Sequence, residues 1–155
     1  MPLHLKLRRG ERLLVNGAVL EVGPRHGELL VHNHSNCLRE GDLLHKEQAT
    51  TPTRRVYFQV QMMIVDPDGR SGYRARFAEL TVQLERALMN PQILERLAQV
   101  RAEVAADRHY RALALLRAVL KYEDMLLSRA RLQAAQEAER EAYTMLAACP
   151  AAVAS

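Results

Sequence analysis

The stretch from residue 3 to residue 22, LHLKLRRGERLLVNGAVLEV, decides the first half of the fold. Its first six residues alternate leucine with His, Lys or Arg, which is the pattern of a half-buried β-strand. Further along, Asn16-Gly17 separates two apolar runs, and these residue types readily adopt the two positive φ angles of a type I′ turn. The stretch therefore predicts a strand followed by a β-hairpin.

Short strands continue beyond this stretch. Apolar residues bounded by turn residues predict strands over 28–34 and 37–39, so the first 45 residues form several short strands in a row. Residues 48–53 combine turn and cap residue types without any periodicity. We expect them to form an ordered linker.

A last strand is expected after this linker. Alternate positions are apolar: Phe58, Val60, Met62 and Ile64. The run ends at the sequence DPDG of residues 66–69, whose residue types favour a turn. We therefore predict that an extended segment over 58–64 closes the sheet.

The hydrophobic period becomes that of a helix from Tyr73 onward. Asn90-Pro91 ends the first helical segment, and Asp107 is a candidate N-cap for the third, which could continue past Gln133. The three apolar stripes are Phe77, Leu80, Leu84 and Leu88; Ile93, Leu97, Val100 and Val104; and Leu113, Leu116, Leu120 and Leu127. We expect these stripes to pack against the sheet or one another, with a helical partner surface as the alternative.

These patterns predict an α+β protein. A small basic antiparallel β module, a sandwich or a partly open barrel, would occupy residues 1–72. A three-helix module would follow over 73–148 and serve for packing or partner binding. Pro150 and the alanine-rich end predict a disordered tail over 149–155.

Charge and composition limit the classes of function. Residues 1–76 hold twelve Lys and Arg against eight acidic residues, whereas the rest of the chain is balanced, so a polyanion would bind the first part. Two cysteines, Cys37 and Cys149, are typical of a reducing cytoplasm and are expected to be free thiols. Charges in the first twelve residues predict no export signal, and no apolar run is long enough to cross a membrane. We expect a soluble cytoplasmic protein.

Catalytic and metal motifs are weak. The acidic pairs of the chain lie in a turn or side by side on a helix, and no Walker-type loop, GxSxG or HExxH sequence occurs. His32, His34 and Cys37 have metal-ligand spacing but lack a fourth ligand, so surface histidines are the preferred interpretation. We predict no catalytic residue, no metal and no cofactor.

Two arginine pairs are the candidate binding residues. Arg8-Arg9 and Arg54-Arg55 lie beside predicted turns, where guanidinium groups can contact phosphates and stack on unpaired bases. Solvated surface charge is the alternative interpretation. In the predicted strand Phe58 would face the core, which leaves Tyr57 free to stack on a base.

The string ATTPTRRVYF at residues 49–58 resembles the ATTP-x-RR-x-YF signature of the FlbT family, the flagellin-expression regulators of alphaproteobacteria. Further matches in the same order are MPL at 1–3, GER at 10–12, VNGA at 15–18, LRE at 38–40, NP at 90–91, YRAL at 110–113 and YED at 122–124. The likeness covers about residues 1–128. Gln59 and Gln61 depart from it, because apolar strand residues are expected there.

This resemblance implies a post-transcriptional regulator. Such a protein associates with the 5′ untranslated leader of flagellin mRNA and promotes its degradation, although some members act positively. Flagellin and the FlaF family are the implied protein partners. An adaptor that binds flagellin or a FlaF-like protein, with an indirect effect on mRNA, is the competing hypothesis, and nuclease activity is a distant third.

A shorter likeness concerns the mode of binding. Residues 3–13 and the LRE at 38–40 are similar to the carbon storage regulator family, whose small β proteins form intertwined dimers on mRNA leaders. It implies RNA contacts for Arg8 and Arg39 and a homodimer formed through the β part. Leu7 stands where that family has an arginine. The full predicted RNA-binding set is Lys6, Arg8, Arg9, Arg12, Arg39, Arg54, Arg55 and Tyr57.

Overall fold

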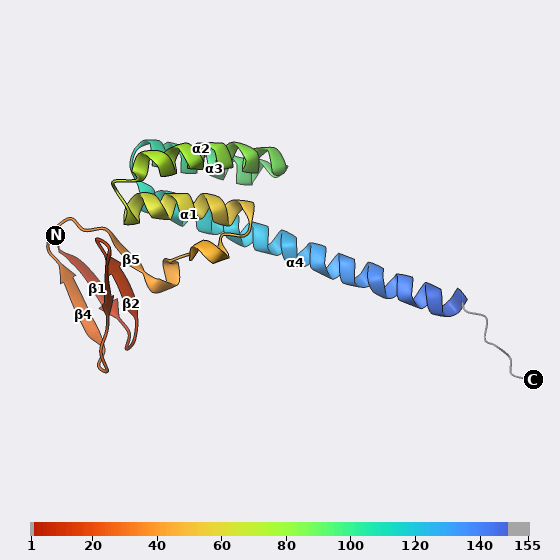
Figure 1. The fold of residues 1–155 in the computed structure, drawn as a ribbon, viewed down its shortest axis with the longest axis horizontal. Helices are drawn as coiled ribbons and strands as arrows, with labels where there is room; N and C mark the ends of the chain where they lie inside the picture. Colours follow the sequence, from red (N-terminus) through yellow and green to blue (C-terminus); the bar gives the residue numbers. More distant parts are fainter. Residues whose placement is uncertain (1, 149–155) are drawn as a thin grey trace, which may run out of the picture. The chain divides into compact units, whose positions relative to one another are not determined.

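The computed structural model of the chain describes residues 2–148 and has an α+β fold (Figure 1). Five strands in two small antiparallel sheets precede four α-helices within this range, so the predicted fold class is confirmed. The predicted disordered tail lies outside the described residues. Contacts divide the chain into two compact units, Met1–Val119 and Leu120–Ser155. The predicted division into a β module over 1–72 and a helical module over 73–148 stays a prediction.

The strands form two separate sheets. Strand β1 (Leu3–Leu7) pairs with β4 (Gly27–Val31), while β2 (Arg12–Val15) lies between β3 (Ala18–Glu21) and β5 (Cys37–Arg39). The alternating leucines of β1 therefore form a strand as predicted. Every pairing is antiparallel, and the two residues between β2 and β3 form the short turn that such a pair allows.

The predicted hairpin turn is confirmed. Asn16 and Gly17 have φ angles of 46° and 86°, which are the two left-handed positions that an Asn-Gly turn supplies. The turn is also held from a distance, because Asn36 N–H donates to the Asn16 side chain and Asn16 N–H donates to the Asn36 carbonyl. These bonds place the start of β5 beside the hairpin.

The strand predicted over 58–64 is wrong, because this segment belongs to helix α1 (Pro52–Val65). The Thr51 hydroxyl accepts the Arg54 N–H as an N-cap, and Pro52 occupies the first turn, where its missing N–H costs nothing. The buried side chains recur every three or four residues: Thr53, Val56, Tyr57, Val60, Gln61, Met63 and Ile64. The predicted linker over 48–53 is thus partly the beginning of a helix.

Three further helices complete the described chain: α2 (Arg70–Ala87), α3 (Pro91–Ala105) and α4 (His109–Ala148). They correspond to the three predicted helices, and α1 brings the number to four. The predicted turn after residue 65 separates α1 from α2, and the two helices pack together as a hairpin.

The junction before α4 differs from the prediction. Asp107 has a positive φ of 57°, and its carboxylate accepts a hydrogen bond from Arg74 at 2.7 Å. It is therefore not the N-cap of α4, which begins at His109.

In the first compact unit, partly buried polar contacts join the segment after β5 to the helices. Gln61 on α1 accepts from the Leu44 N–H and donates to the Leu44 carbonyl, at 2.7 and 2.9 Å. The Tyr57 hydroxyl donates to the carbonyl of Asp42, whose carboxylate pairs with Arg117 on α4 at 2.8 Å. The segment that follows β5 is thus fixed to α1 and α4.

In the second unit α4 continues to Ala148, as the sequence predicted for an extended third helix. None of the described helices combines the length and apolar character that a membrane span requires.

Candidate nucleic-acid interface

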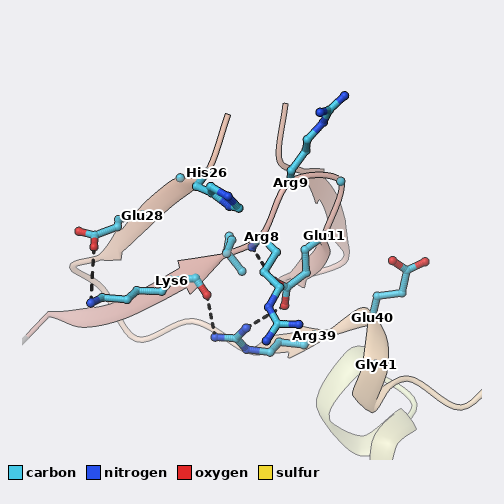
Figure 2. A pocket seen from close by; sticks show the side chains of 12 residues that line it. Lys6, Arg8, Arg9, Glu11, His26, Glu28, Arg39, Glu40 and Gly41 are labelled. Atoms are coloured by element: carbon cyan, nitrogen blue, oxygen red, sulfur yellow. Dashed lines mark hydrogen bonds and ion pairs between the residues drawn. The ribbon is translucent and has the colours of Figure 1, made fainter. Parts of the chain in front are cut away.

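An open pocket of about 1090 Å³ lies where the ends of several strands meet (Figure 2). Its walls come from the end of β1, the loop to β2, the start of β4, and the end of β5 with the short 3-10 helix that follows. Four of the predicted RNA-binding residues line it: Lys6, Arg8, Arg9 and Arg39.

Strand pairing brings these residues together from distant parts of the sequence. Leu13 pairs with Arg39, which places the end of β5 beside the start of β2. The loop before β2 is fixed by Gly10, whose φ of 72° favours glycine and whose N–H donates to the Val22 carbonyl. Arg8 and Arg39 therefore approach one another although 30 residues separate them.

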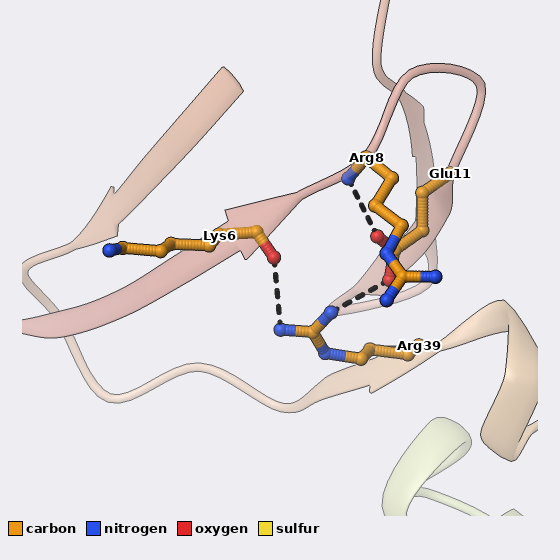
Figure 3. Close-up of polar contacts among 4 residues, drawn as sticks. All are labelled: Lys6, Arg8, Glu11 and Arg39. Atoms are coloured by element: carbon orange, nitrogen blue, oxygen red, sulfur yellow. Dashed lines mark hydrogen bonds and ion pairs between the residues drawn. The ribbon is translucent and has the colours of Figure 1, made fainter. Parts of the chain in front are cut away.

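A hydrogen-bonded cluster organises the centre of this pocket (Figure 3). Arg39 donates to the Glu11 carboxylate at 2.7 Å and to the Lys6 carbonyl at 3.2 Å. The other Glu11 oxygen accepts the Arg8 N–H at 2.8 Å. The Arg8 N–H and the Arg39 guanidinium together lower the pKa of Glu11, because both favour the carboxylate.

The pocket contains acidic groups as well as basic ones. Glu11, Glu28 and Glu40 line it together with the cationic residues. Lys6 lies 4.0 Å from Glu28, and both side chains are mostly exposed. Exposed ion pairs of this kind contribute about 0–1 kcal/mol, so a phosphate can replace such a partner at small cost.

Arg8 and Arg9 are the two cations best placed to bind a ligand. Both side chains are exposed, and their guanidinium groups form no ion pair with the part of the chain that the structure describes. Arg9 points away from the Arg8, Glu11 and Arg39 cluster in Figure 2. It can therefore contact a ligand that extends beyond the pocket.

Arg12 lies outside this pocket. Its guanidinium pairs with Glu21 across the hairpin at 3.1 Å and with Glu40 at 3.8 Å. Both pairs are half exposed, so Arg12 holds β2 and β3 together more than it extends the cationic surface.

The remaining predicted residues belong to α1 and do not line the pocket. Arg55 is exposed, and its Nε–H donates to the Ala49 carbonyl at 3.4 Å. Arg54 follows the N-cap of the helix.

Tyr57 is only 4% exposed, and burial raises the pKa of its hydroxyl. The prediction that Tyr57 is free to stack is therefore wrong, because it assumed a strand in which neighbouring side chains face opposite sides.

Comparison with known proteins identifies the family. The family model of the flagellar protein FlbT matches residues 3–127. The chain is 39% identical to the probable flagellum biosynthesis repressor protein FlbT of Caulobacter sp. (strain K31), over 82% of this chain and 97% of that protein. It is 38% identical to the flagellum biosynthesis repressor protein FlbT of Caulobacter vibrioides, over 80% of this chain and 88% of the relative. This chain belongs to the FlbT family.

A more distant relative extends the likeness to another genus. The probable FlbT repressor of Rhizobium etli is 36% identical, over 81% of this chain and 84% of that protein. No solved structure matches the chain. The FlbT match includes the whole pocket, whereas the end of α4 after residue 127 lies beyond it.

The acidic residues and the histidine of the pocket were not among the predicted site residues, and Glu11 and His26 differ in how far the sequence signals them. Glu11 could have been found from the sequence, because Gly10 before it favours a turn, and this turn returns the Glu11 side chain to the Arg8 N–H. His26 has no such local signal, since only the pairing of Leu7 with Gly27 carries it to the pocket.

The histidine and cysteine motif is placed apart from this pocket. Cys37 is half-buried, and burial raises the pKa of its thiol. Across the described residues, no three His, Cys, Asp or Glu side chains gather closely enough to hold a metal ion. Cys149 lies outside that range.

Proposed function

We propose that this FlbT chain is a cytoplasmic post-transcriptional repressor of flagellum biogenesis that binds the 5′ untranslated leader of flagellin mRNA and promotes its degradation. The observation that supports it best is the convergence of Lys6, Arg8, Arg9 and Arg39 on one open pocket. The names of the Caulobacter relatives, which describe repressors of flagellum biosynthesis, agree with this proposal.

In this proposal the protein binds RNA and performs no chemistry on it. Guanidinium groups of Arg8 and Arg9 contact leader phosphates, and their planar faces stack on unpaired bases. Arg39 stays oriented by Glu11 while its remaining N–H groups face the ligand. The bound leader is closed to ribosomes, and cellular nucleases then degrade the exposed transcript.

The proposed interface is smaller than the predicted one. Tyr57 contributes to the core instead of stacking on a base. Arg54 and Arg55 lie on α1, which does not line the pocket. We therefore expect substitutions of Arg8 and Arg9 to weaken leader binding more than substitutions of Arg54 and Arg55.

A filter-binding titration with the flagellin leader tests the proposal. The variant Arg8→Ala/Arg9→Ala should bind about tenfold or more weakly, because it loses two phosphate contacts. The matched control Arg86→Ala/Arg96→Ala removes two exposed arginines from α2 and α3 and should bind like the parent protein.

Other outcomes would support different functions. Equal affinity of both variants would contradict the proposed pocket. If the parent protein does not bind the leader at all, the competing function is favoured, in which this chain is an adaptor for flagellin or a FlaF-like protein. Cleavage of the leader by the purified chain, abolished by a chelator, would instead indicate a metal-dependent nuclease.

A further inference from the structure

A second, smaller pocket adjoins the cationic one. It has a volume of about 320 Å³ and lies where the strands of the first compact unit meet the beginning of α4. Arg39 lines both pockets, so a ligand that contacts Arg39 from the cationic pocket can continue into the second one. We call the second one the leucine pocket, because its apolar walls are Leu3, Leu5, Leu13, Leu38 and Leu113.

Tyr110 on α4 contributes an aromatic ring to the leucine pocket. Its side chain is 44% exposed, whereas Tyr57 is only 4% exposed. Burial raises the pKa of the Tyr110 hydroxyl, and a hydrogen bond from the backbone of Cys37 opposes this increase. The ring is therefore held at its hydroxyl end, while part of its surface stays accessible to a ligand.

Charged groups accompany the apolar walls. Arg117 pairs with Asp42 at 2.8 Å, and both side chains are partly exposed. With Arg39, the pocket contains two arginines and one aspartate, a net charge of +1, which favours a ligand that belongs to an anionic chain. A purely apolar group would cover these charges without forming hydrogen bonds to them, which costs free energy. A flat ring with polar edges fits the pocket better.

We propose that the leucine pocket receives one unpaired base of the bound RNA and that Tyr110 stacks on this base. The inference rests on the proposed function, because Arg39 and the adjoining cationic pocket hold the neighbouring phosphates. Arg117 supplies donors and Asp42 supplies acceptors for the edges of the base.

The size of the leucine pocket agrees with one base. Its volume is at the lower end of the range of roughly 300–1,000 Å³ for ligand pockets, which suits a single small ring and not a helix or strand of a protein. The base itself can be any of the four, because each has a π-face that stacks on an aromatic ring. All of the lining residues lie within the FlbT match.

Binding of a short single-stranded fragment of the flagellin leader tests this subsite. Tyr110→Leu should bind the fragment about fivefold or more weakly, because the stacking on one base is lost. The slope of log K against log[salt] should remain that of the parent protein, because no charge is removed. Tyr110→Phe keeps the ring and should bind like the parent. The matched control Tyr143→Leu removes a 75% exposed tyrosine from α4 and should also bind like the parent.

Leader fragments that lack a single base locate the bound base. In the parent protein, one abasic position should weaken binding about as much as Tyr110→Leu does. In Tyr110→Leu, the same abasic position should have no further effect, because the two changes remove the same contact. The scan of abasic positions in the parent protein needs no variant. Circular dichroism of each variant checks that the fold is kept.

Contrary results are equally specific. If no abasic position weakens binding to the parent, or if Tyr110→Leu binds like the parent, no base occupies the pocket. Equal weakening by Tyr110→Leu and Tyr110→Phe would show that the hydroxyl matters and the ring does not stack. If Tyr110→Leu loses affinity for flagellin or a FlaF-like protein but not for RNA, the occupant is a protein side chain.

These outcomes are distinguishable from failure of the proposed function. The leucine pocket is overturned alone if Arg8→Ala/Arg9→Ala weakens leader binding while the Tyr110 variants and abasic fragments do not. A parent protein that does not bind the leader overturns both proposals.

Discussion

The strands and the helices of the first compact unit are stabilised in different ways. Among the described residues nineteen apolar side chains are buried, and only Leu7, Leu13 and Leu38 come from strands. The other sixteen lie on the helices. The strands instead carry the charged pocket and its hydrogen bonds. The apolar scaffold and the candidate binding site are therefore built from different parts of the sequence.

This difference has an energetic consequence. Sheets of two and three strands with so few buried residues are marginal on their own in water. We therefore expect the sheets to depend on the contacts of the segment after β5, namely those of Leu44 with Gln61 and of Asp42 with Tyr57 and Arg117. The helices hold the strands in place, and the strands present the pocket.

The largest expected effect concerns the helical core. Leu97 on α3 is fully buried, so Leu97→Ala should lower the free energy of unfolding by about 2–5 kcal/mol in urea titrations. In contrast, Val19 on β3 is 66% exposed, and Val19→Ala should cost under about 1 kcal/mol. Similar losses for both variants would contradict the division between scaffold and site.

The next effect concerns the connection between the two regions. Gln61→Ala removes the partners of both the N–H and the carbonyl of Leu44, which should cost about 1–3 kcal/mol. Gln59→Ala, on the same helix but not buried, is the matched control and should stay within about 0.5 kcal/mol of the parent. Equal stabilities would show that the strands do not depend on this contact.

Acid should weaken the helical region first. His109 is 5% exposed, its Nε2 has no hydrogen-bond partner among the described residues, and burial together with Arg70 and Arg74 lowers its pKa against the opposing effect of Asp107. The unfolded chain therefore binds a proton more readily, so the free energy of unfolding should fall as the pH drops below about 6.5. His109→Gln should remove that dependence in urea titrations between pH 5 and pH 8. If the free energy of unfolding of the variant depends on pH as it does in the parent protein, His109 is not the responsible group.

A smaller effect should appear in the strands at lower pH. Because the folded protein lowers the pKa of Glu11, its stabilising effect is present above the ordinary glutamate pKa of about 4.3 and is lost as the pH falls below it. In Glu11→Gln the free energy of unfolding, measured by urea titration, should depend less on pH in that range. If the free energy of unfolding of this variant falls with pH as steeply as that of the parent protein, another carboxylate is responsible.

The strands were predictable because their signals are local. Alternating leucines and the Asn-Gly turn specify β1 and the hairpin without any distant contact. Helix α1 was missed because its sequence fits two periods. Phe58, Val60, Met62 and Ile64 alternate as in a strand, yet Val60, Met63 and Ile64 also recur at helical spacing, and the helical packing prevailed. Thr51-Pro52 was the decisive signal, since it is a helix start.

The candidate site was predictable only in part. The charge asymmetry of the sequence indicated the basic residues, and four of them do converge. Their arrangement depends on strand register, because the pairing of Leu13 with Arg39 cannot be read from either segment alone. The burial of Tyr57 and the role of Glu11 as an internal partner of Arg39 likewise follow from the tertiary structure.

The salt dependence of leader binding tests the central claim most directly. If Lys6, Arg8, Arg9 and Arg39 neutralise about four phosphates, log K against log[salt] should have a slope near −3 for single-stranded RNA. The slope should halve, to about −1.4, in Arg8→Ala/Arg9→Ala and stay unchanged in Arg86→Ala/Arg96→Ala. A flat salt response, or an identical slope in all three proteins, would contradict RNA capture by this pocket.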